Sequence, residues 1–152
     1  MFRGVSHINL DAKGRMAMPA KYRDRVASEF SGLMVMTIDT QTRCLLLYPL
    51  ATWEVLEKQI QDLPSFDPAV KRFQRLTIGY ASDLELDGSG RLLLPQALRD
   101  YASLDKKVVL VGQGKKFELW SEEAWLDSRE TWLAEEAEGD VLASDALKNL
   151  AM

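Results

Sequence analysis

The stretch Asp11-Ala-Lys-Gly-Arg-Met-Ala-Met-Pro-Ala-Lys-Tyr-Arg-Asp24 occurs a second time as Asp87-Gly-Ser-Gly-Arg-Leu-Leu-Leu-Pro-Gln-Ala-Leu-Arg-Asp100. The two stretches align without a gap, and the residue types Asp, Gly, Arg, Pro, Arg and Asp recur at the same places. An apolar–polar–apolar triplet precedes each stretch, Ile8-Asn9-Leu10 and then Leu84-Glu85-Leu86. These matches indicate two copies of one structural unit.

A second pair of matching segments follows further along each copy. Leu47-Tyr48 with Trp53 corresponds to Leu119-Trp120 with Trp125. These two segments are four positions closer together in the chain than the two turn motifs are. We therefore expect one connection in the second copy to be four residues shorter than in the first.

Each copy predicts the order strand, turn, strand, helix, strand, strand. The turn is Asp-x-x-Gly, and the proline that ends the second strand is tolerated in a first helical turn. The pattern predicts helices over residues 20–29 and 96–103, and strand pairs over 33–39 with 44–48 and 107–112 with 116–120. Gly112-Gln113-Gly114 is the expected turn of the last pair. A unit of about 45 residues is too small to bury a good core alone, so we expect the two copies to interlock across a pseudo-twofold axis.

The expected fold class is therefore α+β, with four segments along the chain. The first repeat covers residues 5–52, a helical connector covers 53–80, the second repeat covers 81–124, and an acidic helix and tail cover 125–152. In the connector, Asp67 followed by Pro68 predicts a capped helix start.

The net charge of −4 hides an uneven distribution. Residues 121–152 hold nine acids and two bases, a net of −7, so residues 1–120 carry +3. Residues 1–25 hold six bases and two acids, a net of +4. Solvated surface charge is one explanation, and a basic binding face with an acidic tail elsewhere is the other.

The sequence shows no sign of a membrane segment, a disulfide framework or a catalytic site. No stretch approaches the ~20 apolar residues of a membrane helix, and no signal peptide is evident, so a cytoplasmic location is expected. The single cysteine, Cys44, lies in an apolar run and is expected to be a buried apolar residue. The single histidine has no partner set, and no metal, phosphate-loop or nucleophile-elbow motif is present. We therefore expect no enzyme, no metal and no cofactor.

The repeated turn, Asp11-x-x-Gly14-Arg15 and Asp87-x-x-Gly90-Arg91, has three interpretations. In the structural one, the aspartate hydrogen-bonds its own turn, the glycine supplies a positive φ, and the arginine pairs with the aspartate. In the second, the arginine binds DNA, because its planar fork fits guanine or phosphate. Lys13 would add a phosphate contact that Ser89 cannot make, so the halves should contact DNA unequally. The third, catalysis, lacks a nucleophile.

At these residues the sequence resembles the SpoVT-AbrB DNA-binding domains, whose strand–turn–strand carries Asp, Gly, Arg and Pro in this order. Two such units, the opening Met1-Phe2-Arg3-Gly4 and the segment Leu47-Tyr48-Pro49-x-x-x-Trp53 resemble the MraZ family of bacterial transcription regulators. The resemblance covers residues 1–125. It implies a pseudo-dimeric, swapped-hairpin β-barrel of two ββαββ repeats with peripheral helices.

The resemblance also implies a function and a set of site residues. The protein should bind double-stranded promoter DNA with short repeats, repress its own gene and the division and cell-wall gene cluster, form a homo-oligomeric ring, and associate with the nucleoid. An oligomeric interaction scaffold without specific DNA binding is the alternative. The expected DNA-binding residues are Arg15, Lys13, Arg91, Arg3, Arg23 and Arg99, supported by the turn residues Asp11, Gly14, Asp87 and Gly90.

Overall fold

The structure, a computed structural model, describes residues 1–139, 144–150 and 152. The chain forms two compact units, Met1–Glu122 and Glu123–Met152. The expected acidic region extends over residues 140–143 and 151, which lie outside the described residues. Neither the boundary between the repeats nor the four-segment division is tested, and both stay predictions.

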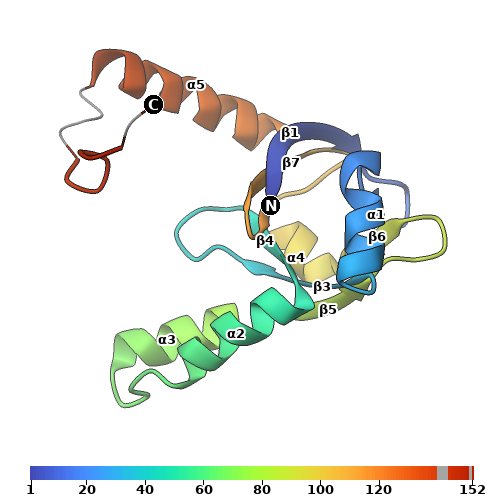
Figure 1. Cartoon of the computed structure of the whole chain (residues 1–152), viewed down its shortest axis with the longest axis horizontal. Helices are drawn as coiled ribbons and strands as arrows, with labels where there is room; N and C mark the ends of the chain where they lie inside the picture. The colour runs from blue at the N-terminus through green and yellow to red at the C-terminus, as the bar shows by residue number, and fades with distance from the viewer. Residues whose placement is uncertain (140–143, 151) are drawn as a thin grey trace. The chain divides into compact units, whose positions relative to one another are not determined.

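Both copies have the expected order of elements (Figure 1). The first copy contains β1 (Phe2–Asn9), β2 (Arg15–Ala17), α1 (Ala20–Glu29), β3 (Leu33–Ile38) and β4 (Leu45–Pro49). The second contains β5 (Ser82–Glu85), β6 (Arg91–Leu93), α4 (Gln96–Tyr101), β7 (Lys107–Gly114) and β8 (Phe117–Ser121).

The remaining helices are α2 (Leu50–Gln61) and α3 (Pro68–Thr77) between the copies, and α5 (Glu122–Glu138) after them. Helix α3 begins as the sequence predicts, because the Asp67 side chain accepts a hydrogen bond from the Ala69 N–H and Pro68 occupies the first turn. The Gln74 side chain of α3 donates to the Ile60 carbonyl of α2, which joins the two helices into a pair. Within the described residues, the helices all lack the length and apolar character needed to cross a membrane.

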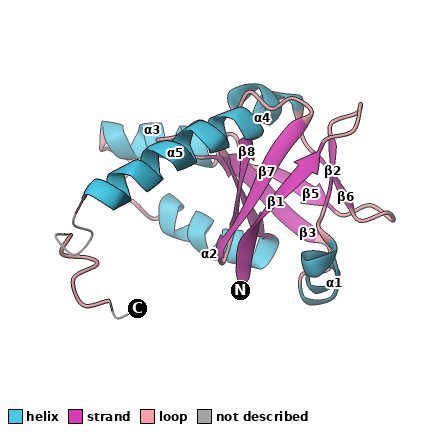
Figure 2. Cartoon of the chain, turned by 90° about the horizontal axis from the view of Figure 1, so that it is seen from above, coloured by secondary structure: helices cyan, strands magenta, loops and turns pink. Residues whose placement is uncertain are grey.

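The strands of the two copies alternate in one antiparallel sheet, whose order is β1-β7-β8-β4-β3-β5. This order is symmetric when each strand is exchanged for its counterpart in the other copy. The first strand of each copy pairs with the third strand of the other, β1 with β7 and β5 with β3. Figure 2 shows β1 and β7 side by side, with β2 and β6 beyond them.

A pseudo-twofold axis passes through two strand pairs, β4 with β8 and β2 with β6. In the first, Leu46 faces Glu118, and in the second Met16 faces Leu92. Each of these residues therefore faces its own counterpart in the alignment of the two copies. This arrangement puts β2 and β6 in a two-stranded ribbon of their own.

The expected α+β class is confirmed, whereas a closed barrel is not found among the described residues. The six-stranded sheet has two edges, β1 and β5. The strand that follows each edge strand in sequence, the three-residue β2 or β6, does not join this sheet, and β2 and β6 pair with each other instead. The swapped-hairpin description of the repeat stays a prediction.

Two sequence predictions of local structure were wrong. The four-residue shortening is shared by two connections, since Ile8 faces Val108 and its counterpart Leu84 faces Met34. Met34 thus corresponds to Val108, and these two residues are two positions closer together in the chain than the two turn motifs are. Two of the four residues are therefore missing from the connection before the third strand, and the other two from the connection after it. In addition, the turn predicted at Gly112-Gln113-Gly114 lies further along the chain. The Gln113 N–H donates to the Lys116 carbonyl at 2.9 Å, so Gly114, with a φ of +82°, and Lys115 form the centre of the turn. Gly112 still pairs with Phe117 of β8, and β1 pairs with β7 as far as Gly114.

Both copies contribute to one hydrophobic core, as the expected interlocking requires. Met16 and Leu92 are both 0% exposed where they meet on the axis. Phe2 of the first copy stacks on Phe117 of the second, with ring centroids 4.2 Å apart. The Asp-x-x-Gly-Arg turns of both copies are therefore supported by a core that neither copy could form alone.

Candidate nucleic-acid interface

The turn of the first copy is organised by one carboxylate. Oδ1 of Asp11 accepts the backbone N–H groups of Lys13 (3.0 Å) and Arg15 (2.8 Å), and the Asp11 carbonyl accepts the Gly14 N–H (3.0 Å). Oδ2 accepts Nε of the Arg15 side chain at 2.6 Å. Gly14 has a φ of +82°, which an L side chain adopts only with strain. The aspartate thus fixes both the backbone of the turn and the direction of Arg15.

The turn of the second copy repeats this arrangement bond for bond. Oδ1 of Asp87 accepts the N–H groups of Ser89 and Arg91, both at 2.9 Å, and Oδ2 accepts Nε of Arg91 at 3.0 Å. Gly90 has a φ of +75°. The ion pair of the structural interpretation is therefore present in both copies, but it engages only Nε. Within the part of the chain that the structure describes, the terminal amino groups of Arg15 have no hydrogen-bond acceptor.

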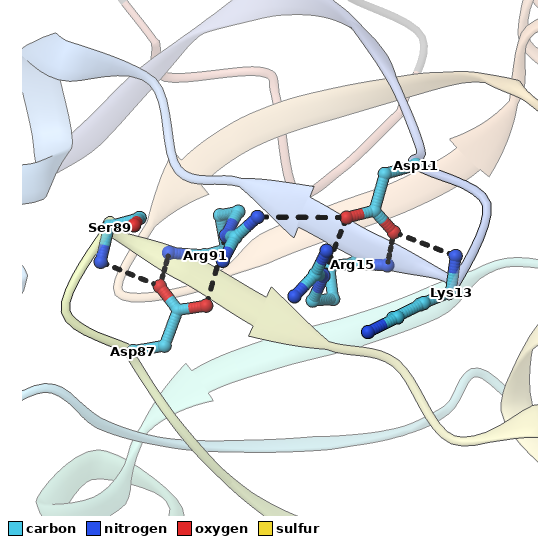
Figure 3. Close-up of polar contacts among 6 residues, drawn as sticks. All are labelled: Asp11, Lys13, Arg15, Asp87, Ser89 and Arg91. Carbon is cyan, nitrogen blue, oxygen red and sulfur yellow. Dashed lines mark hydrogen bonds and ion pairs between the residues drawn. The ribbon is translucent and has the colours of Figure 1, made fainter.

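The two turns meet on the β2–β6 ribbon (Figure 3). Arg15 and Arg91 lie between Asp87 at one end of the ribbon and Asp11 at the other. Nη1 of Arg91 is 3.9 Å from Oδ2 of Asp11, so that Asp11 faces both arginines. The side chains of Arg15 and Arg91 are 27% and 33% exposed, which leaves both reachable from solvent.

Hydrogen bonding makes both aspartates more acidic. The backbone N–H of Arg15 is the largest influence on Asp11 and lowers its pKa below the ordinary value, with further lowering from the Arg15 side chain. The backbone N–H of Arg91 has the same effect on the pKa of Asp87. Both carboxylates are therefore ionised at neutral pH and hold the arginines in place.

The helix arginines Arg23 and Arg99 have a different environment. Nε and Nη2 of Arg23 donate to the Met18 carbonyl, at 3.2 and 2.9 Å, and Nε of Arg99 donates to the Leu94 carbonyl at 3.0 Å. A β-carbon on Gly90 would come within 2.6 Å of the Arg23 side chain. Each helix arginine thus covers the turn glycine of the other copy, a packing role that no sequence signal indicated.

The structure does not bring Arg3 to the ribbon. Arg3 pairs with Gln113 near the start of β1, whereas the turn follows Asn9 at its end. Asn9 is six positions further along the strand than Arg3, which is about 20 Å at about 3.3 Å per residue. Lys13, in contrast, is exposed at the tip of the turn. Of the six expected DNA-binding residues, the ribbon groups Arg15, Lys13 and Arg91, with Arg23 and Arg99 beneath them.

Sequence analysis missed Lys106 and Lys107, two exposed lysines just before and at the start of β7. The Leu10 N–H donates to the Lys106 carbonyl at 2.7 Å, and Lys107 pairs with Asn9, so both lysines lie beside the first turn. In sequence they belong to the other copy and lie far from that turn. Only the cross-copy pairing of β1 with β7 could have revealed this proximity.

Of the described residues, one group of side chains could hold a metal ion: Asp39, Cys44 and Glu118. Burial is the main cause that raises the pKa of the Cys44 thiol, followed by Glu118 and Asp39, so the protonated thiol is favoured. A thiol in this state is a poor ligand.

Fold and site together define a class of protein in which two repeats interlock in one chain about a pseudo-twofold axis. Each repeat presents an arginine, held by an aspartate, on a shared two-stranded ribbon. Comparison with known proteins gives the family. A family model described as "MraZ protein, putative antitoxin-like" matches residues 1–76 and 78–142. The chain belongs to the MraZ family.

Three curated relatives illustrate the similarity, and all are named "Transcriptional regulator MraZ". A protein of Alkalilimnicola ehrlichii is 62% identical over 135 residues, covering 89% of this chain and 90% of the relative. One from Coxiella burnetii is 53% identical over 153 residues, covering 100% of both chains. One from Legionella pneumophila is 53% identical over 137 residues, covering 90% of each.

Proposed function

We propose that this protein is a sequence-specific, DNA-binding transcription regulator whose DNA contact is the β2–β6 ribbon. The observation that carries the proposal is the pair of arginines, Arg15 and Arg91, held by aspartates on a single exposed ribbon. The names of its relatives support the same class of function.

The geometry of the arginines suits contact with base edges in the major groove. Each aspartate binds Nε, and the two terminal nitrogens of Arg15 stay available to donate in parallel, as the O6 and N7 acceptors of guanine require. A two-stranded ribbon fits the width of that groove. Because the turns fix the arginines before DNA arrives, little side-chain entropy is lost on binding.

Each Asp–Arg pair is electrically neutral, so affinity for the phosphate backbone must come from other residues and from multiple subunits. We propose that several copies assemble into a ring and bind short repeats in promoter DNA together. Neighbouring subunits on neighbouring repeats gain up to ~10²–10⁴ over one site through effective concentration. A ring requires a head-to-tail interface that closes.

The proposal includes the regulated genes and the location of the protein. It acts chiefly as a repressor of its own gene and of the division and cell-wall gene cluster, and it is cytoplasmic and associated with the nucleoid. It is not an enzyme, needs no cofactor, and has the swapped-hairpin fold of SpoVT-AbrB domains. These points rest on the family resemblance and on the names of the relatives.

The test is binding of the purified protein to the DNA just upstream of its own gene, with scrambled DNA as competitor, at two salt concentrations. Selective binding that weakens with salt supports the proposal, since log affinity falls by about 0.9 per log salt for each phosphate contacted. Equal binding to both DNAs would reduce the protein to a non-specific DNA binder. No binding at either concentration would refute the proposal.

One observation favours an alternative, an interaction scaffold without specific DNA binding. The α2–α3 pair exposes apolar side chains, among which Phe66 is 89% exposed between the two helices, and Val55 of α2 lines a hollow of about 1040 Å³. Exposed apolar surface of this kind is typical of protein–protein contacts. If Phe66→Ser abolishes self-association while operator binding by one subunit persists, the surface serves assembly. If wild type does not bind DNA, and Phe66→Ser instead loses the binding of a different protein, the scaffold is favoured.

A further inference from the structure

The pseudo-twofold axis provides an internal comparison between the two ends of the ribbon. At one end, the Leu10 N–H donates to the Lys106 carbonyl at 2.7 Å. At the other, the Leu86 N–H donates to the Gly32 carbonyl at 2.9 Å. Lys106 and Gly32 therefore occupy equivalent positions, each beside the turn of the other copy. We call these places the turn-1 end (residues 9–15 and 105–107) and the turn-2 end (residues 85–91 and 31–33).

The two ends have equivalent backbone hydrogen bonds but opposite net charge. Exposed lysines at the turn-1 end are Lys13, Lys106 and Lys107, and the residues at the equivalent places are Ser89, Gly32 and Leu33. Asp105 offsets one lysine, which leaves a net of +2 once each Asp–Arg pair is counted as neutral. The turn-2 end has instead the exposed Glu85 where the first copy has Asn9, a net of −1.

At one of these three positions, the backbone explains why the turn-2 end has no lysine. The third strand of the second copy follows the short helix α4 and the loop Ala102 to Lys106, whereas in the first copy the longer α1 leaves only Phe30 to Gly32 before β3. Gly32 has a φ of +72°, so a side chain there is strained. Lys106 is not among the described residues with positive φ, and it lines a hollow of about 490 Å³ together with Asp11 and Ala12.

We propose that Lys106 and Lys107 are phosphate-binding residues that, with Lys13, make the turn-1 end the dominant contact, so that each subunit binds its DNA repeat in one orientation. The inference rests on the proposed function and deepens it. A lysine ammonium attracts a phosphate without needing bidentate geometry, whereas Glu85 would repel a phosphate at the turn-2 end. A symmetric charge distribution would allow both orientations equally.

The first experiment compares Lys106→Ala/Lys107→Ala with Lys71→Ala/Arg72→Ala, a control that removes two exposed positive charges from α3. Affinity for the upstream DNA is measured over a range of salt concentrations. Loss of two phosphate contacts lowers the salt slope per subunit by about 1.8, and the control leaves it unchanged. If wild type binds selectively and both variants keep its slope, the inference is wrong while the proposed function stands. If wild type shows no selective binding, the proposed function itself fails.

The second experiment measures orientation. Cys44 is buried, so a cysteine introduced at either turn tip can be labelled selectively with an iron chelate that cleaves nearby DNA. Ala12→Cys and Gly88→Cys occupy equivalent tips, and a β-carbon on Gly88 meets nothing within 4 Å. We expect the two labels to cleave opposite flanks of a single repeat. Cleavage of both flanks by each label would show that the subunit binds in both orientations and would overturn the inference.

Discussion

The guanidinium of Arg99 lies over the α-carbon of Gly14, where a β-carbon on residue 14 would come within 2.5 Å of the arginine Cζ. The two residues belong to different copies, and Arg23 covers Gly90 in the same way. Glycine is therefore required in each turn for two reasons. Its φ is positive, and the arginine of the other copy occupies the space that a β-carbon would need.

Gly14→Ala should destabilise the protein by on the order of 1–3 kcal/mol, because an L side chain is strained at this φ and displaces Arg99. Urea unfolding measures the free-energy change. Adding Arg99→Ala should recover the part due to the clash, as a coupling of about 0.5–3 kcal/mol. Gly88→Ala is the matched control in an unstrained, open position and should stay within about 0.5 kcal/mol of wild type. Equal effects at Gly14 and Gly88 would contradict this account.

Arg15→Ala should abolish selective operator binding with little loss of stability. Asp11 still caps the turn through the backbone, and the ion pair that is lost is screened by solvent. Loss of a bidentate base contact costs about 1–3 kcal/mol, or roughly fivefold to 150-fold in affinity. Arg15→Lys should not restore it, since lysine lacks the fork. Arg91→Ala should have a smaller effect. Gel-shift titrations at one salt concentration measure all three, and normal binding by Arg15→Ala would contradict the assignment.

Arg23→Ala and Arg99→Ala should behave in the opposite way. Each removes a charged donor from a carbonyl in its own copy and packing from the other turn, so stability should fall by about 1–3 kcal/mol. The salt slope of DNA binding should match wild type, because each of these guanidinium groups donates to a carbonyl of its own copy and packs on the turn glycine of the other copy. Unfolding curves and salt titrations of the same samples separate the two effects. A lower slope with unchanged stability would instead place these arginines on the DNA.

Acid should destabilise wild type through the two turn aspartates. Their pKa values are lowered in the folded state, so the stability they contribute is present above the unfolded value of about 3.9 and is lost as pH falls through the lower folded value. Asp11→Asn/Asp87→Asn keeps an acceptor oxygen for the turn but cannot titrate. Its stability should therefore depend less on pH below about 4 than that of wild type. Urea unfolding at pH 7, 4 and 3 measures this, and identical pH profiles would be the contrary result.

The Cys44 thiol should be unreactive in the native protein. Its side chain is 0% exposed and its pKa is raised, first by burial, so little thiolate forms at neutral pH. A disulfide reagent should modify the protein rapidly in urea and only slowly in buffer, at the rate of opening. Fast stoichiometric modification in buffer would show that the segment before β4 opens locally.

Sequence alone could predict the repeat, the order of elements in each copy and the burial of Cys44, because these depend on local patterns. The apolar alternation, Pro19 and Pro95 fix strands and helix starts within a few residues. Sequence alone could not predict the edges of the sheet, the length of β7, or that the four residues missing from the second copy are divided between two connections. These depend on which strand of the other copy lies opposite, and a local pattern holds no information on register.

The same limit applies to the candidate site. The Asp-x-x-Gly-Arg turns were predictable because the hydrogen bonds that Asp11 and Asp87 accept within them span four residues or fewer. The packing of Arg99 on Gly14, and the position of Lys106 beside the first turn, come from strand exchange between copies. Arg3 was expected at the site through the resemblance, but it lies near the start of β1, about 20 Å along the strand from Asn9, after which the turn begins.

The pairing of β1 with β7 imposes an order in time on biosynthesis. Phe2 pairs with Gly114, so β1 leaves the ribosome long before β7 and has no complete partner until synthesis has passed Gly114. At about 5–20 residues per second, β1 waits roughly 5–20 s as an unpaired edge. Pairing over such separations also folds slowly. The nascent chain is therefore most exposed to aggregation before its second half appears, and a truncated first copy cannot complete the sheet.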